Sequence, residues 1–239
     1  MEKIYSKKEK LYFYDCDFKK RAKLSTINKF FAEIAGEAFG ANGMTHQWLW
    51  EHGYAFLLSK MSIAFKRFPK ADETVTVSTW ERGTKGASFL RDFEIFDTEK
   101  NLICSAHSEW ILINPQTRQI IRPSAFEGEQ NVLAEKISDA PDCKRLKLTD
   151  AEIVDKRKIR YSEIDANGHV YNAFYADFAV DALPSHIIEK DILFYQINFI
   201  NEAKLSEEMS IFIKEQEEII TVKGSIAEKD SFVCEIIYK

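Results

Sequence analysis

The sequence predicts an α+β fold in which one unit, an antiparallel sheet wrapped around a long helix, occurs twice. Residues 25–40 and 171–182 both place apolar side chains at helical spacing. Shifting one stripe by 144 positions makes them coincide, pairing Ile27 with Tyr171, Phe30 with Phe174, Phe31 with Tyr175, Ile34 with Phe178 and Ala35 with Ala179. Because one helix and several long strands recur, each copy is expected to wrap its sheet around its helix.

The strands repeat in the same order as the helices. Residues 61–77 and 195–211 both read as alternating strands interrupted by a polar turn. A shift of 134 positions pairs Ile63 with Ile197, Phe65 with Phe199, Lys70 with Lys204 and Val77 with Ile211. These matches indicate an internal duplication. Since each sheet by itself would leave an open edge, we expect the two sheets to join edge to edge.

The remaining segments give element and domain boundaries. Residues 11–24 read as a strand followed by a turn, and Ser25 or Thr26 is the expected N-cap of the first helix. From about 124 to 150 the periodicity is lost and Pro141 occurs, which is typical of a linker. We therefore predict an N-terminal domain at 1–130, a linker at 131–150 and a C-terminal domain at 151–239.

Composition excludes several classes of protein. The 239 residues are 45% hydrophobic and 30% charged, typical of a soluble globular protein. A net charge of -5 disfavours nucleic-acid binding. No apolar run approaches the roughly 20 residues of a membrane span, and the charged N-terminus does not resemble a secretory signal. Four scattered cysteines without a CxxC pair suit a reducing compartment, so we expect a cytoplasmic location.

Common catalytic motifs do not occur in this sequence. It contains no GxSxG, HExxH, GxxxxGK[ST] or GxGxxG pattern. The five histidines are not at metal-ligand spacing. We therefore expect neither a metal nor an organic cofactor.

A candidate site lies at the entrance to the second helix. Asp165, Asn167 and His169 occupy alternate positions just before the apolar stripe. If that segment is extended, the three side chains project into one space. Asp, Asn and His are also ordinary turn and cap residues, so a polar loop that merely caps the helix is the alternative.

The two copies differ at these positions. With the 144-residue shift, the equivalents of Asp165, Asn167 and His169 in the first copy are Arg21, Lys23 and Ser25. With the 134-residue shift, Glu202 of the second copy falls on Phe68 of the first. An active site kept in one copy explains this asymmetry, and it adds Glu202 to the candidates; a solvated turn residue is the alternative for Glu202.

The segments DANGHVYN (165–172) and INEA (200–203) resemble motifs of the acyl-ACP thioesterases of plants and bacteria. Residues 59–80, 83–97 and 106–123 resemble the N-terminal half of that family. The resemblance implies two hotdog folds in one chain. It also implies hydrolysis of the thioester between a fatty acid and acyl carrier protein, within fatty acid biosynthesis and lipid metabolism.

The family's catalytic residues carry over as Asp165, Asn167, His169 and Glu202. One departure concerns the residue after the glutamate, which is usually cysteine in plant members and is Ala203 here. A cysteine nucleophile is therefore missing at this position, and an activated water is expected to attack the thioester.

We expect each site residue to have a distinct role. Glu202 with His169 would activate the water, and Asn167 or a backbone N–H at the helix start would stabilise the oxyanion. Asp165 would accept backbone N–H groups and orient the segment. The alternatives are an acyl-CoA thioesterase, a non-catalytic acyl-binding hotdog module and a dehydratase-like relative.

Two surfaces are expected to bind substrate. Aromatic residues of the first copy would line the acyl chain, with plain core packing as the alternative: Phe30, Phe31, Trp48, Trp50, Tyr54 and Phe56. Basic residues would attract the acidic, acylated carrier protein: Arg118, Arg122, Lys156, Arg157, Lys158 and Arg160. Chain length, saturation and whether the chain forms a homodimer stay open.

Overall fold

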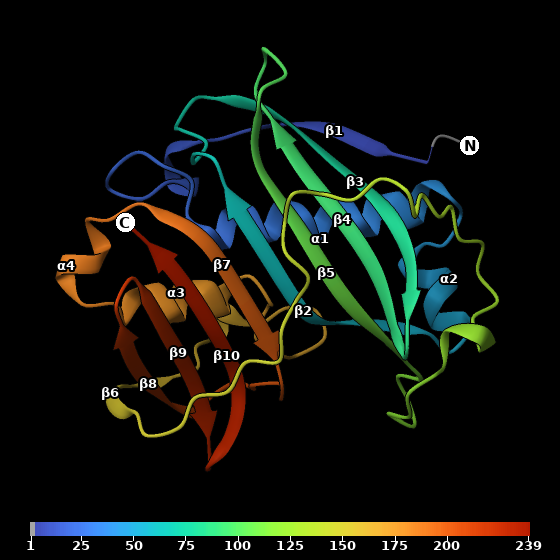
Figure 1. The fold of residues 1–239 in the computed structure, drawn as a ribbon. Helices are drawn as coiled ribbons and strands as arrows, with labels where there is room; N and C mark the ends of the chain where they lie inside the picture. Colours follow the sequence, from blue (N-terminus) through green and yellow to red (C-terminus); the bar gives the residue numbers. More distant parts are fainter. Residues whose placement is uncertain (1–2) are drawn as a thin grey trace. The chain divides into compact units, whose positions relative to one another are not determined.

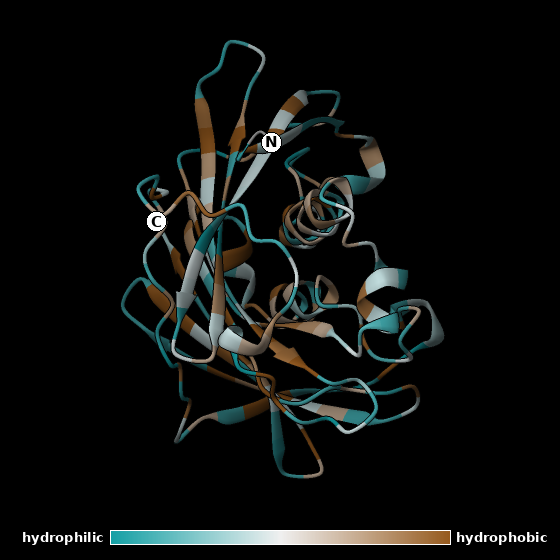
Figure 2. Cartoon of the chain, turned by 90° about the vertical axis from the view of Figure 1, so that its right-hand side faces the viewer, coloured by the Kyte–Doolittle hydropathy of each residue, from teal (hydrophilic) through white to brown (hydrophobic). Residues whose placement is uncertain are grey.

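The computed structural model describes residues 3–239, which form two compact units. Of the described residues, 3–22 and Lys29–Cys143 form the N-terminal unit, and Lys23–Asn28 and Lys144–Lys239 form the C-terminal unit. The ribbon in Figure 1 shows a helix against a multistranded sheet in each. Hydrophobic residues gather on the strands and helices, while most loops are hydrophilic (Figure 2).

The N-terminal unit contains one antiparallel sheet with the strand order β1-β3-β4-β5-β2. Helix α1 lies across one face of this sheet (Figure 1). The elements are β1 (Tyr5–Lys10), η1 (Phe13–Asp15), α1 (Leu24–Ala41), α2 (His46–Glu51), β2 (Ala55–Phe65), β3 (Thr74–Lys85), β4 (Ser88–Phe96), β5 (Leu102–Ile113) and η2 (Pro123–Ala125).

The C-terminal unit repeats this arrangement in the order β6-β8-β9-β10-β7, again antiparallel throughout. Its helix α3 is shorter than α1 and lies on one face of its sheet. The elements are β6 (Glu152–Lys158), η3 (Tyr161–Glu163), α3 (Phe174–Asp181), α4 (Ser185–Ile188), β7 (Ile192–Phe199), β8 (Glu208–Gln216), β9 (Ile219–Ile226) and β10 (Lys229–Tyr238).

The same strand order in both units confirms the predicted α+β duplication. Fully buried apolar side chains from helix and sheet form the centre of each unit, among them Phe31 and Phe93 in the first and Phe178 and Phe232 in the second. The ring centres of Phe31 and Phe93 lie 4.8 Å apart, with the rings tilted by 38°. Edge-to-edge joining of the two sheets and the boundaries 1–130, 131–150 and 151–239 stay predictions.

Three expectations about local structure were wrong. The first strand is Tyr5–Lys10, inside the charged leader, whereas residues 11–24 are mostly loop. A sheet edge tolerates lysines that alternate toward solvent, so charge did not exclude a strand there. Ser25 and Thr26 lie inside α1, which begins at Leu24. The second helix begins only at Phe174, so Tyr171 precedes it.

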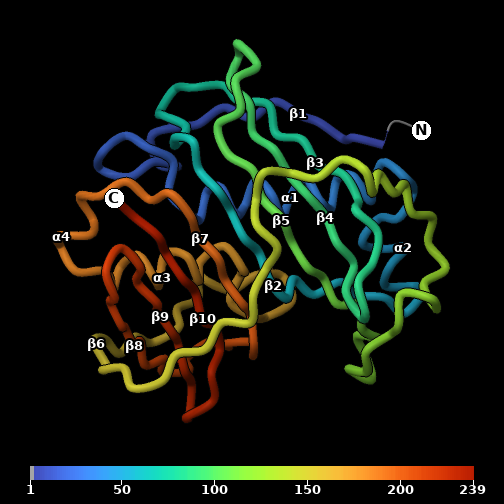
Figure 3. Tube along the Cα trace, viewed as in Figure 1, coloured from blue at the N-terminus to red at the C-terminus, as the bar shows by residue number. Residues whose placement is uncertain are grey.

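Between η2 and β6 the chain has no helix or strand (Figure 3). Within the N-terminal unit this segment covers buried polar groups of the sheet. Pro141 O accepts a hydrogen bond from the Ser62 hydroxyl, and Lys136 O accepts one from Trp80 Nε1 at 2.7 Å. The irregular segment is therefore anchored by defined polar contacts.

Candidate active site

The segment Asp165–His169 folds into a tight turn around one carboxylate. Asp165 Oδ1 accepts hydrogen bonds from the backbone N–H of Asn167 at 2.8 Å and of His169 at 3.4 Å. The backbone closes the turn, because the Asp165 N–H donates to His169 O at 2.8 Å. Gly168 has a φ of 81°, a left-handed conformation that glycine adopts without strain.

This turn confirms that Asp165 accepts backbone N–H groups, and it shows that the segment is not extended. An aspartate that binds the N–H two residues further on offers the backbone an alternative to strand pairing. Alternate spacing therefore does not place Asp165, Asn167 and His169 on one face. Other contacts bring them together.

His169 and Glu202 form the centre of the site. His169 Nε2 lies 3.1 Å from Glu202 Oε2, and the two side chains are 23% and 31% exposed. The loop after β7 brings Glu202 there through backbone pairing. The Val170 N–H donates to Ala203 O at 2.9 Å, and His169 and Lys204 form an isolated antiparallel β-bridge. Glu202 is thus a partly exposed carboxylate within hydrogen-bond distance of His169.

Asn167 is exposed, and its link to the His169–Glu202 pair is indirect, through Asp165. Its side-chain Nδ2 donates to Asp165 Oδ2 at 3.4 Å. The Asp165 carboxylate therefore accepts from both the Asn167 amide and the His169 backbone N–H, and the His169 ring contacts Glu202. All four sequence-predicted residues come together in this way.

Sequence reasoning missed two side chains that brace the Glu202 loop. Tyr175, in α3, accepts a hydrogen bond from the buried Ala203 N–H at 3.2 Å. Ser231, in β10, donates to Asn201 O at 2.7 Å. Burial raises the pKa of Tyr175 above its ordinary value, although hydrogen bonds with Ser231 and Ala203 oppose this shift. The sequence showed Tyr175 as part of the apolar helical stripe. The contact between its hydroxyl and the Ala203 N–H joins residues 28 positions apart, and no local pattern reports it.

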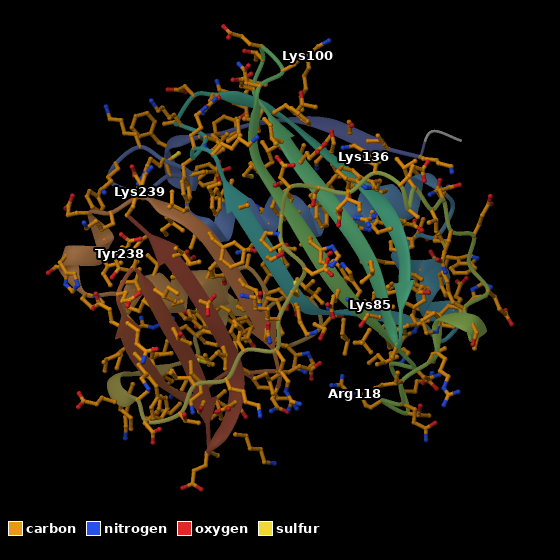
Figure 4. The ribbon with its side chains drawn as sticks, viewed as in Figure 1. Lys85, Lys100, Arg118, Lys136, Tyr238 and Lys239 are labelled. Atoms are coloured by element: carbon orange, nitrogen blue, oxygen red, sulfur yellow. The ribbon has the colours of Figure 1, made fainter. Side chains whose placement is uncertain are left out.

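The predicted docking cations occupy different environments. Arg157 points inward, where it pairs with the buried Glu163 and its Cζ lies 3.6 Å from the centre of the Phe178 ring. Lys156, Lys158 and Arg160 are exposed. Figure 4 shows Arg118 on the loop that follows β5, and Arg122 precedes η2. Arg157 is therefore a structural residue of the C-terminal unit, and docking by the exposed cations stays a prediction.

The N-terminal unit contains the same turn with different side chains. Asp17 Oδ1 accepts the backbone N–H of Lys19 at 2.9 Å and of Arg21 at 3.0 Å. The Asp17 N–H donates to Arg21 O, and the Ala22 N–H donates to Pro69 O. Bond for bond, this network repeats the one formed by Asp165, His169, Val170 and Ala203.

The hydrogen bonds correct the predicted equivalence of the two copies. Asp165, Asn167 and His169 correspond to Asp17, Lys19 and Arg21, 148 positions earlier, and not to Arg21, Lys23 and Ser25. The shifts of 144 and 148 differ by four residues, which is about one helical turn. An apolar stripe looks the same after one turn, so the stripes could not determine which residues of the two copies correspond. Glu202 does correspond to Phe68, because Lys204 and Lys70 form matching bridges.

Cation–π packing replaces the His–Glu pair in the first copy. Arg21 Nη2 binds Asp17 Oδ2 at 3.0 Å, and its Cζ lies 5.5 Å from the centre of the Phe68 ring. Neither group can accept a proton from water at neutral pH. The His–Glu pair of the candidate site therefore has no counterpart at the matching positions of the N-terminal unit.

The six aromatic residues expected to line the acyl chain occupy different environments. Tyr54 packs in a cluster with partly buried Phe56 and Trp48, whereas Phe31 is fully buried and Trp50 is 62% exposed. Phe30 is buried as well. Phe56 lines a small cavity of about 10 Å³, so binding of the acyl chain by this set stays a prediction.

Comparison with known proteins identifies the family. The model of the acyl-ACP thioesterase N-terminal domain matches residues 2–124, and that of the C-terminal domain matches residues 146–238. The chain belongs to the acyl-ACP thioesterase family. Similar curated proteins include a chloroplastic palmitoyl-acyl carrier protein thioesterase of Cuphea hookeriana, 25% identical over 66% of this chain and 40% of its own length.

Another family member is the chloroplastic oleoyl-acyl carrier protein thioesterase 2 of Arabidopsis thaliana, 24% identical over 79% of this chain and 57% of its own length. The chain thus spans roughly half the length of these curated relatives. Among solved structures, an acyl-ACP thioesterase from Bacteroides thetaiotaomicron matches with a TM-score of 0.93 at 23% identity, covering 99% of this chain and 98% of that one.

The 12:0-ACP thioesterase from Umbellularia californica matches with a TM-score of 0.82 at 14% identity, covering 100% of this chain and 98% of that one. These likenesses confirm the predicted hotdog fold of the family. Among residues 3–239, no helix is long and apolar enough to span a membrane, and no group of three His, Cys, Asp or Glu side chains is arranged to hold a metal ion.

Proposed function

We propose that this chain hydrolyses the thioester of fatty acyl-acyl carrier protein and releases a free fatty acid, with water as the nucleophile. The observation that carries the proposal is the His169–Glu202 pair, in which Nε2 and Oε2 lie 3.1 Å apart. The pair is partly exposed, so both substrate and water can reach it. Family membership supports the substrate class.

The contacts suggest a sequence of proton transfers. Glu202, paired with His169, takes a proton from water, and the water oxygen attacks the thioester carbonyl carbon. Asn167 Nδ2, or a backbone N–H at the start of α3, donates to the oxygen that becomes negative. When the C–S bond breaks, the proton held by the pair passes to the carrier's thiolate. Water is consumed, and a fatty acid and a thiol result.

The cysteines of the chain support water rather than a thiolate as the nucleophile. Ala203 occupies the position after Glu202 and is fully buried. Burial raises the pKa of the Cys234 thiol far above its ordinary value, and it raises that of Cys143 to about 12. Thiols of this kind are protonated at neutral pH and are poor nucleophiles. Cys104, Cys143 and Cys234 are free thiols, which suits the reducing compartment that the proposed cytoplasmic location would provide.

Asp165→Ala is expected to lower both kcat and stability. The substitution removes the acceptor that two backbone N–H groups and the Asn167 amide share, so the free energy of unfolding should fall by about 1 kcal/mol. Asp17→Ala removes the equivalent acceptor from the first copy and is the matched control. It should lower stability and leave kcat unchanged. Equal losses of kcat in the two variants would contradict the proposed site.

Tyr175→Phe should lower kcat with little change in KM. Without the hydroxyl, the buried Ala203 N–H has no acceptor there, at a cost of about 1–3 kcal/mol, and the Glu202 loop loses a brace. Steady-state kinetics together with thermal melting measure both effects. Tyr195→Phe is the control, because the buried Tyr195 hydroxyl has no hydrogen-bond partner among residues 3–239. If both variants behave alike, Tyr175 does not position Glu202.

The decisive experiment is hydrolysis of an acyl-ACP panel from short to long chains, followed with a thiol reagent. The same acyl chains on CoA, at equal concentration, separate the two carriers. Thiol release that depends on His169 and Glu202 is expected with acyl-ACP. Preferential release from acyl-CoA would assign the chain to that substrate, and no release from any chain would favour a binding module.

A further inference from the structure

Four large aromatic side chains are exposed together on the N-terminal unit. Tyr12, Phe13, Tyr14 and Phe18 lie within seven residues and are 50%, 69%, 72% and 71% exposed. Single exposed apolar residues are ordinary, but a contiguous cluster marks an interaction surface. Residues 10–20 are here called the aromatic loop.

The aromatic loop has a defined conformation. Its η1 turn is closed by a hydrogen bond from the Tyr12 N–H to Asp15 Oδ2 at 3.0 Å, and Asp17 closes the next turn. The rings of Tyr12 and Tyr14 stack at 5.9 Å with an interplanar angle of 2°. A surface that is already ordered loses less entropy when a partner binds.

The turn itself does not require the exposed aromatic side chains. The C-terminal unit forms the same pair of turns, with Arg160 N–H donating to Glu163 Oε2 at 2.8 Å. There Ser162 stands where the first copy has Tyr14, and Ala166 stands where it has Phe18. Tyr161, which is 84% exposed, stands where the first copy has Phe13. The backbone therefore does not require aromatic side chains at the positions of Tyr14 and Phe18, and these two have another role.

The charges around the aromatic loop indicate an acidic partner. Residues 8–23 contain six basic side chains and three acidic ones, although the whole chain carries -5. Lys10 Nζ lies 5.5 Å from the centre of the Tyr12 ring, and Lys8 and Lys20 are exposed. Two of the three acids are engaged locally, Asp15 with the Tyr12 N–H and Asp17 with Arg21. The surface thus combines aromatic side chains with an excess of positive charge.

We propose that the aromatic loop is a docking surface for the acidic acyl carrier protein. The proposal rests on the proposed function and adds where the carrier binds. Aromatic side chains contribute most of the contact energy at protein interfaces, and the cations steer an acidic partner toward it. The loop acts on the carrier and not on the chemistry, so its loss should spare small thioesters.

The test uses a variant that copies the other half of the chain. Tyr14→Ser/Phe18→Ala installs the residues of Ser162 and Ala166, which the same backbone already accommodates. We expect the KM for acyl-ACP to rise about tenfold or more, with kcat for acyl-ACP and kcat/KM for acyl-pantetheine, which lacks the carrier, unchanged within about twofold. Binding of holo-carrier to an immobilised variant should weaken by the same factor.

A charge variant separates the two contributions of the surface. Lys8→Glu/Lys10→Glu should raise the KM for acyl-ACP and flatten its dependence on salt, whereas the aromatic variant should keep the salt dependence. Lys156→Glu/Lys158→Glu is the comparator on the C-terminal unit. Matching melting curves establish that each variant is folded.

Several outcomes would overturn the proposal. One is an unchanged KM for acyl-ACP in the aromatic variant, and another is a loss carried entirely by the Lys156/Lys158 variant. Wild-type binding to phosphatidylglycerol vesicles that only the aromatic variant loses, with unchanged acyl-ACP kinetics, would assign the loop to a membrane surface. A dimer that this variant dissociates would assign it to a second copy. If the wild type hydrolyses acyl-pantetheine but does not prefer acyl-ACP, acyl carrier protein is not the substrate carrier. That result would contradict both the proposed function and the docking role of the aromatic loop.

Discussion

Glu202→Gln is expected to lower kcat by about 10²-fold or more and to leave KM nearly unchanged. The amide keeps the shape of the side chain and can still lie beside His169 Nε2, 3.1 Å away in the native protein. It cannot take a proton from water at neutral pH. The effect therefore falls on the chemical step, and steady-state kinetics with a saturating acyl-ACP measure it.

Two variants make that result specific. Glu218→Gln removes an exposed carboxylate in the turn between β8 and β9 and should leave kcat unchanged. His169→Ala should lose as much activity as Glu202→Gln, and the double variant should lose little more, because residues that act as one unit are not additive. Near-normal kcat in Glu202→Gln, with a folded but inactive Asp165→Asn, would exchange the roles of the two carboxylates.

Asp92→Ala is expected to destabilise the N-terminal unit by about 3–5 kcal/mol, the usual cost of removing one partner from a buried ion pair. Asp92 is fully buried in β4. Its Oδ1 accepts from His107 Nδ1 at 2.6 Å, and its Oδ2 accepts from Arg82 Nη1 at 2.7 Å and from the Ser138 N–H at 2.9 Å. Without the carboxylate, two buried donors, in His107 and Ser138, and the partly buried Arg82 lose their acceptor.

The pH dependence of this loss follows from the pKa of Asp92. Burial by itself raises that pKa, but hydrogen bonds from His107, Ser138 and Arg82 outweigh burial and lower it. A carboxylate with a lowered pKa contributes stability above its ordinary value, near pH 4, and loses that contribution as the pH falls further. The difference in denaturation midpoint between wild type and variant should therefore be largest at neutral pH and shrink in acid.

An exposed ion pair is the control for Asp92. Lys85, marked in Figure 4, lies 3.4 Å from Asp142, and the two side chains are 70% and 77% exposed. Asp142→Ala should change the free energy of unfolding by less than about 1 kcal/mol, because water screens such pairs. A comparable loss in both variants would show that the Asp92 network contributes no more than a surface pair.

The duplication could be predicted from the sequence because burial imposes a period on the residues. Ile63 and Ile197 recur in order with their neighbours, and both lie fully buried in strands. The register of the helices could not be predicted in the same way, since a helical stripe looks alike after each turn. The edge strand Tyr5–Lys10 was missed because its lysines obscure its alternation.

The residues of the candidate site could be chosen from the sequence, whereas their geometry could not. Asp165 and His169 are neighbours along the chain, so their turn depends on local chemistry. Glu202 reaches His169 only because the chain beside it pairs with Val170. Such pairings join segments more than 30 residues apart, and no local pattern in the sequence reports them. The same reason hid the contact between Tyr175 and Ala203.

The matched turns of the two units also say something about how this protein could be redesigned. Arg21 and Phe68 stand on the backbone positions that hold His169 and Glu202 in the other half. An imidazole beside a carboxylate can exchange a proton near neutrality, whereas a guanidinium over a benzene ring carries a permanent charge. The scaffold accepts either pair without changing its hydrogen bonds. The same backbone thus supports different side-chain chemistry in the two units. The positions of Arg21 and Phe68 are therefore suitable places to introduce a second reaction centre.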